Sequence, residues 1–149
     1  MARSAPTATY DDVNLVLRLY DMRREERLRK ARSWFTAKFH VSSMEDVAAL
    51  CPPGSDEDAS MRMVIGYWEM VASFVASGVL NADLFFESGR ELLLCWARVE
   101  PIVPGVRKMF ADPAVWHNLE KVAGEYKAWL ENRTPGSYEA FRARISNVR

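Results

Sequence analysis

The sequence predicts an all-α protein, a single domain over residues 1–149 folded as an antiparallel bundle of about five to seven helices. Three observations support this prediction. Apolar residues recur at spacings of three and four along most of the chain, no segment alternates apolar and polar residues, and short Pro- or Gly-containing connections separate the periodic segments. Of the 149 residues, 49% are hydrophobic, which is enough to form a core without a metal ion or disulfide bonds.

The first predicted helix begins after a capping box at Thr9 and runs to about Phe39, preceded by an expected flexible tail over 1–8. Acid-before-base pairs at i,i+4, such as Glu25 with Arg29, favour a solvated helix face. The apolar residues of this helix keep steps near three and four, the helical period, through Val13, Leu17, Tyr20, Leu28, Ala31 and Phe35.

A short helix that begins near Ser42 ends at the Pro/Gly loop 51–55. The following helix spans 55–77, with a serine as its N-cap residue and acidic residues in its first turn. We expect this helix to be central, because its apolar residues leave only a narrow polar seam of Arg62, Gly66, Glu69 and Ser73.

After a short helix that Asn81 caps, a second central helix is predicted over 90–100, because its run of leucines, cysteine and tryptophan is apolar on all sides. Pro101 and Pro104 are expected to bend or break it. Asp112, which a proline follows, is expected to begin the next amphipathic helix. That helix ends at a Pro/Gly loop over 133–137, after which a short C-terminal helix is stable only if it docks on the rest.

Composition argues against several classes of function. The chain has 20 basic and 20 acidic side chains and a formal net charge of +0, so it lacks the positive field of a dedicated nucleic-acid binder. Its longest uncharged stretch, 70–82, is shorter than the ~20 residues that span a bilayer, so we expect no membrane insertion.

The two cysteines, Cys51 and Cys95, belong to no metal-binding or redox motif, and no signal peptide is visible. We therefore expect a cytoplasmic protein without disulfide, metal ion or cofactor. Cys51, in a loop, is expected to be the more reactive thiol.

Glu69 is a weak candidate for a catalytic or ligand-binding carboxylate, because it lies on a mostly apolar helix where desolvation raises a carboxyl pKa. Arg62, Arg90 and Arg98 are its candidate partners in a ligand-binding seam. We favour a structural ion pair between Glu69 and one of these arginines, because buried charges are usually paired.

A run of basic residues in the first helix is a candidate for contact with an anionic surface, namely Arg23, Arg24, Arg27 and Lys30. The neutral net charge and the interspersed glutamates favour a solvated, salt-bridged face instead. His117 and Glu120 share a helix face, as an acid/base pair or half a metal site would. We favour an ordinary histidine beside a carboxylate, since no further ligands are evident.

None of the motifs that identify a reaction from sequence is present, such as a P-loop, a dinucleotide-binding glycine turn, a nucleophile elbow or a zinc-binding HExxH helix. The leading hypothesis is a non-enzymatic interaction or regulatory module that acts through a protein partner or through self-association. Two alternatives remain open: a small-ligand-binding or catalytic domain, and a domain that binds an anionic surface.

Several segments, taken in order, carry a resemblance to a known family: 17–24, 67–70, 78–81, 84–86 and 96–101. Over roughly residues 10 to 130, the chain resembles a bacterial family of helical domains of unknown function, the family numbered 4760. The resemblance implies a helical fold and no established activity or site residues. Many members of that family carry membrane helices ahead of the domain, which this sequence lacks, so membrane attachment is not implied.

Overall fold

The computed structural model describes residues 6–146, which form nine α-helices, one 3-10 helix and no strand. The all-α prediction is confirmed, whereas the expected five to seven helices are too few. The first five residues of the expected tail and the last three residues of the chain lie outside the described range. The helices are α1 (Tyr10–Arg24), α2 (Glu26–Lys38), α3 (Met44–Leu50), α4 (Asp56–Ala76), α5 (Ala82–Phe86), α6 (Glu91–Val99), η1 (Glu100–Ile102), α7 (Val103–Phe110), α8 (His117–Arg133) and α9 (Ser137–Ser146).

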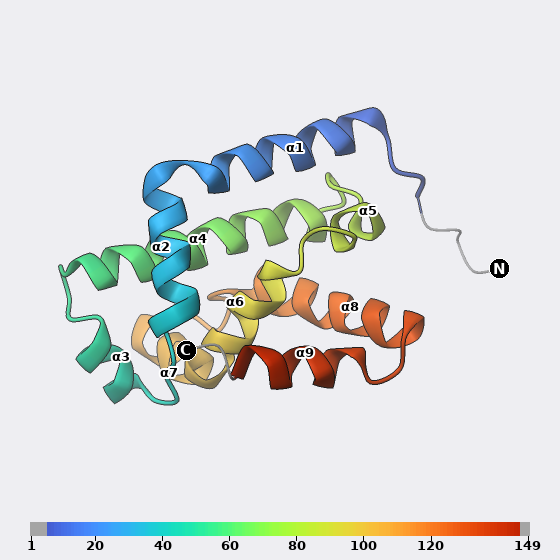
Figure 1. The fold of residues 1–149 in the computed structure, drawn as a ribbon. Helices are drawn as coiled ribbons and strands as arrows, with labels where there is room; N and C mark the ends of the chain where they lie inside the picture. The colour runs from blue at the N-terminus through green and yellow to red at the C-terminus, as the bar shows by residue number, and fades with distance from the viewer. Residues whose placement is uncertain (1–5, 147–149) are drawn as a thin grey trace.

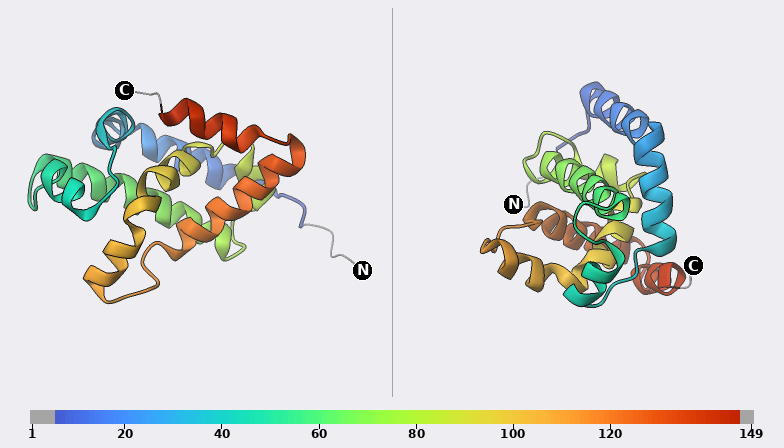
Figure 2. Two further views of the ribbon diagram at one scale, coloured as in Figure 1. Left: turned by 90° about the horizontal axis from the view of Figure 1, so that it is seen from below. Right: turned by 90° about the vertical axis from the view of Figure 1, so that its left-hand side faces the viewer.

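Helix α4 occupies the centre of the fold, as its apolar sides predict. It packs against α2, α6 and α8, and the side chains of Trp68, Val71 and Ala72 are almost completely buried. Helices α1, α4 and α8 lie one below another in Figure 1, where α2 runs across α4 on one side, and Figure 2 shows that α8 runs obliquely to α1 and α4. No helix within residues 6–146 combines the length and apolar character needed to cross a bilayer.

The second central helix, α6, is short and buried, and the chain continues from it through η1 into α7. Pro101 and Pro104 lie in the first turns of η1 and α7. A backbone N–H in the first turn has no acceptor within its helix, so a proline there removes no helical hydrogen bond. The prolines therefore redirect the chain, and the helix after them was not expected from the sequence.

The prediction of one long first helix is wrong, because the helix breaks at Glu25. The backbone of this residue is extended, with φ of −54° and ψ of 141°, and its carboxylate accepts a hydrogen bond from the backbone N–H of Leu28 at 3.1 Å. Glu25 thus caps α2 instead of pairing with Arg29 along a continuous helix. The hydrogen bonds to backbone N–H groups hold the pKa of Glu25 below its ordinary value.

Two other helix starts differ from the sequence prediction. Helix α3 is capped by Ser43, one residue later than expected, through the N–H of Asp46. Helix α8 begins at His117 and not at Asp112, whose carboxylate instead accepts from the N–H of Ala114 at 2.8 Å within a turn. This contact satisfies the aspartate locally, so the Asp-Pro pair closes a turn before the helix starts.

The C-terminal helix α9 docks on α8, as its short length requires (Figure 2). Tyr138 and Ile145 of α9 are buried. The carboxylate of Glu131 accepts hydrogen bonds from the backbone N–H groups of Gly136 at 2.8 Å and Tyr138 at 2.9 Å. These contacts fix the turn between α8 and α9.

Candidate functional site

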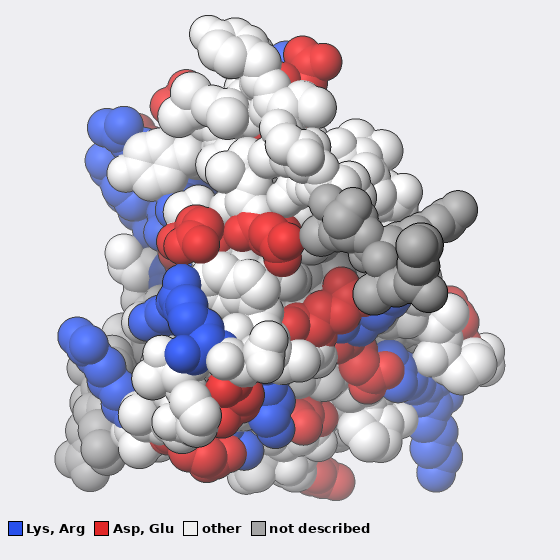
Figure 3. Space-filling model, turned by 90° about the vertical axis from the view of Figure 1, so that its right-hand side faces the viewer, with Lys and Arg blue, Asp and Glu red and all other residues white. Residues whose placement is uncertain are grey.

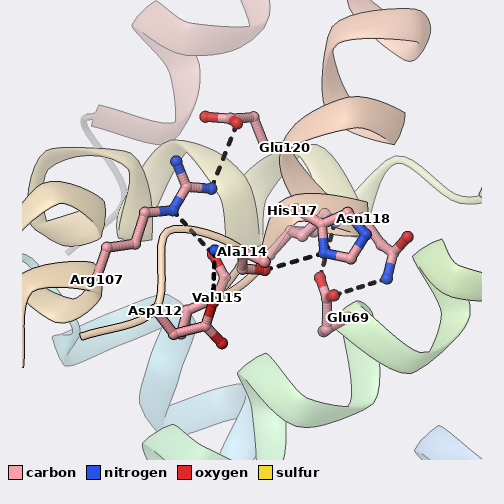
Figure 4. Close-up of polar contacts among 9 residues, drawn as sticks. Glu69, Arg107, Asp112, Ala114, Val115, His117, Asn118 and Glu120 are labelled. Atoms are coloured by element: carbon pink, nitrogen blue, oxygen red, sulfur yellow. Dashed lines mark hydrogen bonds and ion pairs between the residues drawn. The ribbon is translucent and has the colours of Figure 1, made fainter. Parts of the chain in front are cut away.

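Glu69 extends from the middle of α4 to the first turn of α8 (Figure 4). Its Oε2 accepts from the backbone N–H of Leu119 at 2.8 Å, and its Oε1 accepts from Nδ2 of Asn118 at 3.0 Å. The N-cap residue of α8, Trp116, has no side-chain oxygen to supply a cap. Glu69 therefore serves as the missing cap from a neighbouring helix, and its charge matches the positive end of the α8 dipole.

The three arginines expected beside Glu69 lie in different places. Arg62 is exposed and pairs with Asp58 one turn earlier on α4, at 3.5 Å. Arg90 borders an open depression formed by α2, α6 and α9, whereas Arg98 is buried in the last turn of α6. The structure does not bring the four residues of the predicted seam together.

Arg98 joins three helices. Its Nη1 donates to the carbonyl of Phe39 at 2.9 Å and more weakly to that of Phe35 at 3.5 Å, and its Nη2 donates to the carbonyl of Ile145 at 3.1 Å. Nη1 also lies 3.2 Å from Nε2 of His40. Because α2 and α9 both end at these carbonyls, Arg98 satisfies helix C-termini that are buried beneath the surface. Burial lowers the pKa of Arg98.

A second ionic cluster ties α1 and α2 to α6. Arg32 binds Glu91 through two contacts of 2.6 Å, from Nε and Nη2, and its Nη1 donates to the carbonyl of Arg23 at 2.8 Å. The guanidinium of Arg23 lies 3.6 Å from the same Glu91 carboxylate. Sequence analysis did not single out Glu91, because its partners lie about sixty positions away in the chain.

The predicted anionic-surface residues therefore do not form one free basic face. Arg23 faces Glu91, and Lys30 pairs with Glu26 at 2.9 Å on the helix surface. The guanidinium of Arg24 lies over the ring of Tyr20, 5.4 Å from its centroid.

His117 and Glu120 each contact another group instead of one another (Figure 4). Nδ1 of His117 lies 2.9 Å from the carbonyl oxygen of Ala114, and Glu120 forms an ion pair of 3.3 Å with Arg107. Within residues 6–146, no group of three His, Cys, Asp or Glu side chains is placed to hold a metal ion. These contacts connect the first turn of α8 to the preceding turn and to α7.

Cys51, expected to be the more reactive thiol, is buried at the end of α3. Burial raises its pKa, and the nearby carboxylates of Asp58 and Glu57 act in the same direction. A position next to the loop therefore does not expose this thiol, although Cys95 is buried still more completely.

The outer face of α1 carries four exposed apolar side chains, and three of them belong to the apolar pattern that predicted the helix. Glu25 separates α1 from α2, so the rotation of α1 about its axis does not depend on that of α2. Other residues of α1 therefore face the core. The exposed fractions are 81% for Tyr10, 40% for Val13, 56% for Leu17 and 47% for Tyr20. The side chains that face the core are Asp12, Leu15, Val16 and Leu19. Mostly uncharged side chains cover the upper part of the face in Figure 3, where α1 lies.

Two apolar hollows lie on the described surface. One, of about 260 Å³, lies between α1, α4 and the α5–α6 connection and is bordered by Tyr20, Arg23 and Trp68. The other, of about 370 Å³, lies between α3, α4 and α7 and includes Met109 and Trp116. Arg62 and Asp58 both line this second hollow, and they form an ion pair with one another.

Comparison with known proteins supports the resemblance noted in the sequence. A family model described as a domain of unknown function, DUF4760, matches residues 8–146. No curated protein and no solved structure matches the chain. The family match covers all nine α-helices of the described residues. The chain therefore belongs to the DUF4760 family of domains of unknown function.

Proposed function

We propose that this chain is a non-enzymatic interaction module that self-associates through the outer face of α1. The observation that carries the proposal is the exposed stripe of Tyr10, Val13, Leu17 and Tyr20, spaced by three, four and three residues. This spacing is that of the contact positions of a helix pair. A contiguous apolar face on an otherwise polar helix is typical of an interaction surface.

The helix dipole and one charge of α1 favour a second copy of the same helix as the occupant. Arg24 lies on the line of the apolar stripe, seven residues after Leu17, whereas Asp11 and Arg18 lie on other sides of the helix. In an antiparallel pair centred on Leu17, the two helix dipoles oppose one another, which is favourable. Tyr10 of each copy also lies near Arg24 of the other, where a cation–π contact is favourable.

The size of this face predicts a weak dimer. A helix of 15 residues is about 22 Å long at 1.5 Å per residue. Pairing over this length buries less than the ~1,200 Å² of a standard stable interface. We therefore expect association in the micromolar to millimolar range.

The partners of the polar candidate residues also support a role without catalysis. Glu69 caps a helix, Arg98 binds carbonyl groups, and Glu91 is held by two guanidinium groups. Each of these side chains has a structural role in joining helices. Internal contacts do not account for the apolar outer surface of α1.

Sedimentation equilibrium over a range from ~1 μM to ~1 mM protein tests the proposal. We expect the wild-type mass to rise from monomer to dimer, and Leu17→Lys to remain monomeric, because two lysines then meet at the centre of the interface. Met22→Lys is the matched control, since Met22 is 43% exposed on the same helix but points about 160° away from the centre of the stripe. A monomeric wild type at the highest concentration, or association of Leu17→Lys as tight as that of the wild type, would overturn the proposal.

The contact between Tyr10 of one copy and Arg24 of the other tests the antiparallel arrangement. Arg24→Glu removes this cation–π contact and should weaken the dimer, whereas Arg18→Glu, which changes another side of α1, should leave the affinity unchanged. Equal dimer affinities of the wild type and Arg24→Glu would show that these ends do not meet.

A further inference from the structure

A groove between α2, α6 and α9 gathers positive charge on a chain whose formal net charge is +0. It consists of two adjoining hollows of about 690 Å³ and 510 Å³, which share Arg90, Leu94 and Phe141 as lining residues. The arginines that line this basic groove are Arg29, Arg32, Arg90 and Arg144. Clefts lined by charges of one sign concentrate the electrostatic field and attract ions of the opposite sign.

The acidic side chain among the described lining residues of the basic groove is Glu91. Both of its carboxylate oxygens accept hydrogen bonds of 2.6 Å from Arg32, and Arg23 lies 3.6 Å from the same carboxylate. Arg32 is therefore paired and is not available to a ligand. Because two guanidinium groups already share Glu91, this carboxylate does not balance the charge of the other arginines.

The other three arginines of the groove have no acidic partner. Arg29, Arg90 and Arg144 form no ion pair with a carboxylate within residues 6–146, and each of them is exposed. The hydroxyl of Tyr126, which lies near Arg90, is uncharged, and burial raises its pKa. The three guanidinium groups come from three different helices, and an anion in the groove can reach them from solvent.

Apolar and hydroxyl-bearing side chains lie between the arginines. Leu94 and the ring of Phe141 are half-buried and belong to both hollows, while Ser33 and Thr36 border the groove from α2. At the ~30 Å³ that a water molecule occupies in the liquid, the larger hollow holds roughly twenty non-hydrogen atoms. This is about the size of a nucleotide and much larger than an inorganic phosphate ion.

We propose that the basic groove binds an organic phosphate of about the size of a nucleotide. Its phosphate oxygens accept hydrogen bonds from Arg29, Arg90 and Arg144, because the planar guanidinium group matches phosphate geometry with two parallel N–H donors. Its organic body lies against the apolar side chains of Leu94 and Phe141. No residue of α1 lines the groove, so the site does not require self-association.

Titration of ¹⁵N-labelled protein with ADP at constant ionic strength tests this proposal, because ADP combines a diphosphate with a planar organic group. We expect backbone resonances of residues that line the groove to move saturably with millimolar ADP. Adenosine, which is uncharged, and inorganic pyrophosphate, which lacks the organic body, should each bind at least about tenfold more weakly. Resonances that stay in place, or adenosine or pyrophosphate binding as tight as that of ADP, would overturn the inference.

Two arginines of α9 provide a matched pair of variants. Arg144→Gln removes a charge from the groove and should weaken ADP binding at least about fivefold. Arg142→Gln removes the same charge from the same helix, outside the groove lining, and should leave the affinity unchanged. Both arginines are exposed, so neither variant should unfold the protein. Equal affinities of the two variants would overturn the inference. Self-association is measured without ADP and depends on α1, so the two proposals fail independently.

Discussion

Replacing Arg98 with methionine removes a charged donor from the point where α2, α6 and α9 meet, while the length of the side chain is nearly kept. Two hydrogen bonds of good length are lost, to Phe39 at 2.9 Å and to Ile145 at 3.1 Å. Each is worth about 1.5–3 kcal/mol when the donor is charged, and release of the buried guanidinium from its desolvated site offsets part of the sum. We expect Arg98→Met to lower the free energy of unfolding by about 3 kcal/mol.

Urea denaturation followed by far-UV circular dichroism measures this change. Arg98→Lys should lose about half as much, because one ammonium group cannot reach both carbonyls in the fork geometry of a guanidinium. The control is Arg62→Met, whose exposed ion pair with Asp58 should contribute less than ~1 kcal/mol. A loss below ~1 kcal/mol for Arg98→Met would show that solvent replaces these hydrogen bonds and that Arg98 does not hold the helix ends together.

Three further predictions concern other parts of the structure. Gly89→Ala should lower the free energy of unfolding by about 1–3 kcal/mol in urea denaturation, because the new Cβ would lie 2.3 Å from the Phe85 ring. Gly124→Ala should instead raise it by about 0.8 kcal/mol, because its Cβ meets no atom within 4 Å and alanine favours the helix. Backbone hydrogen bonds hold the pKa of Asp12 below its ordinary value of about 4, so this carboxylate stabilises the fold above that pH and the contribution is lost as pH falls through the lowered pKa. Denaturation of Asp12→Asn at several pH values should therefore vary less across the acidic range than that of the wild type, and equal slopes would contradict the assignment. Burial raises the pKa of the Cys95 thiol, so a disulfide reagent should modify it only as fast as the protein unfolds, and rapid labelling of the native state would show an opening that the structure lacks.

Local capping chemistry explains why many helix boundaries were predictable. Thr9, Ser55 and Asn81 each accept a hydrogen bond from the backbone N–H three residues later, as their positions in the sequence indicate. Gly78 adopts the positive φ of 81° that follows the end of α4. These contacts depend on neighbours in the chain, so the sequence holds all the information needed.

The break at Glu25 shows where this reasoning fails. Glutamate favours a helix interior in sequence, but here its carboxylate caps the next helix while Arg32 holds the carbonyl of Arg23 across the bend. The bend depends on Glu91, which fixes Arg32 from a distant helix. The apolar pattern runs through both helices, but after the break only its second half, Leu28, Ala31 and Phe35, is buried.

The sequence by itself determined the all-helical class, the central position of α4 and the ends of most helices, because periodicity and capping act over a few residues. The tertiary structure alone decided which charges meet. Glu69 reaches α8 and not an arginine, Arg98 reaches the ends of α2 and α9, and the face of α1 with Leu17 turns to solvent. Each of these contacts joins helices far apart in the chain, and the rotation of a helix about its axis depends on all of its neighbours at once.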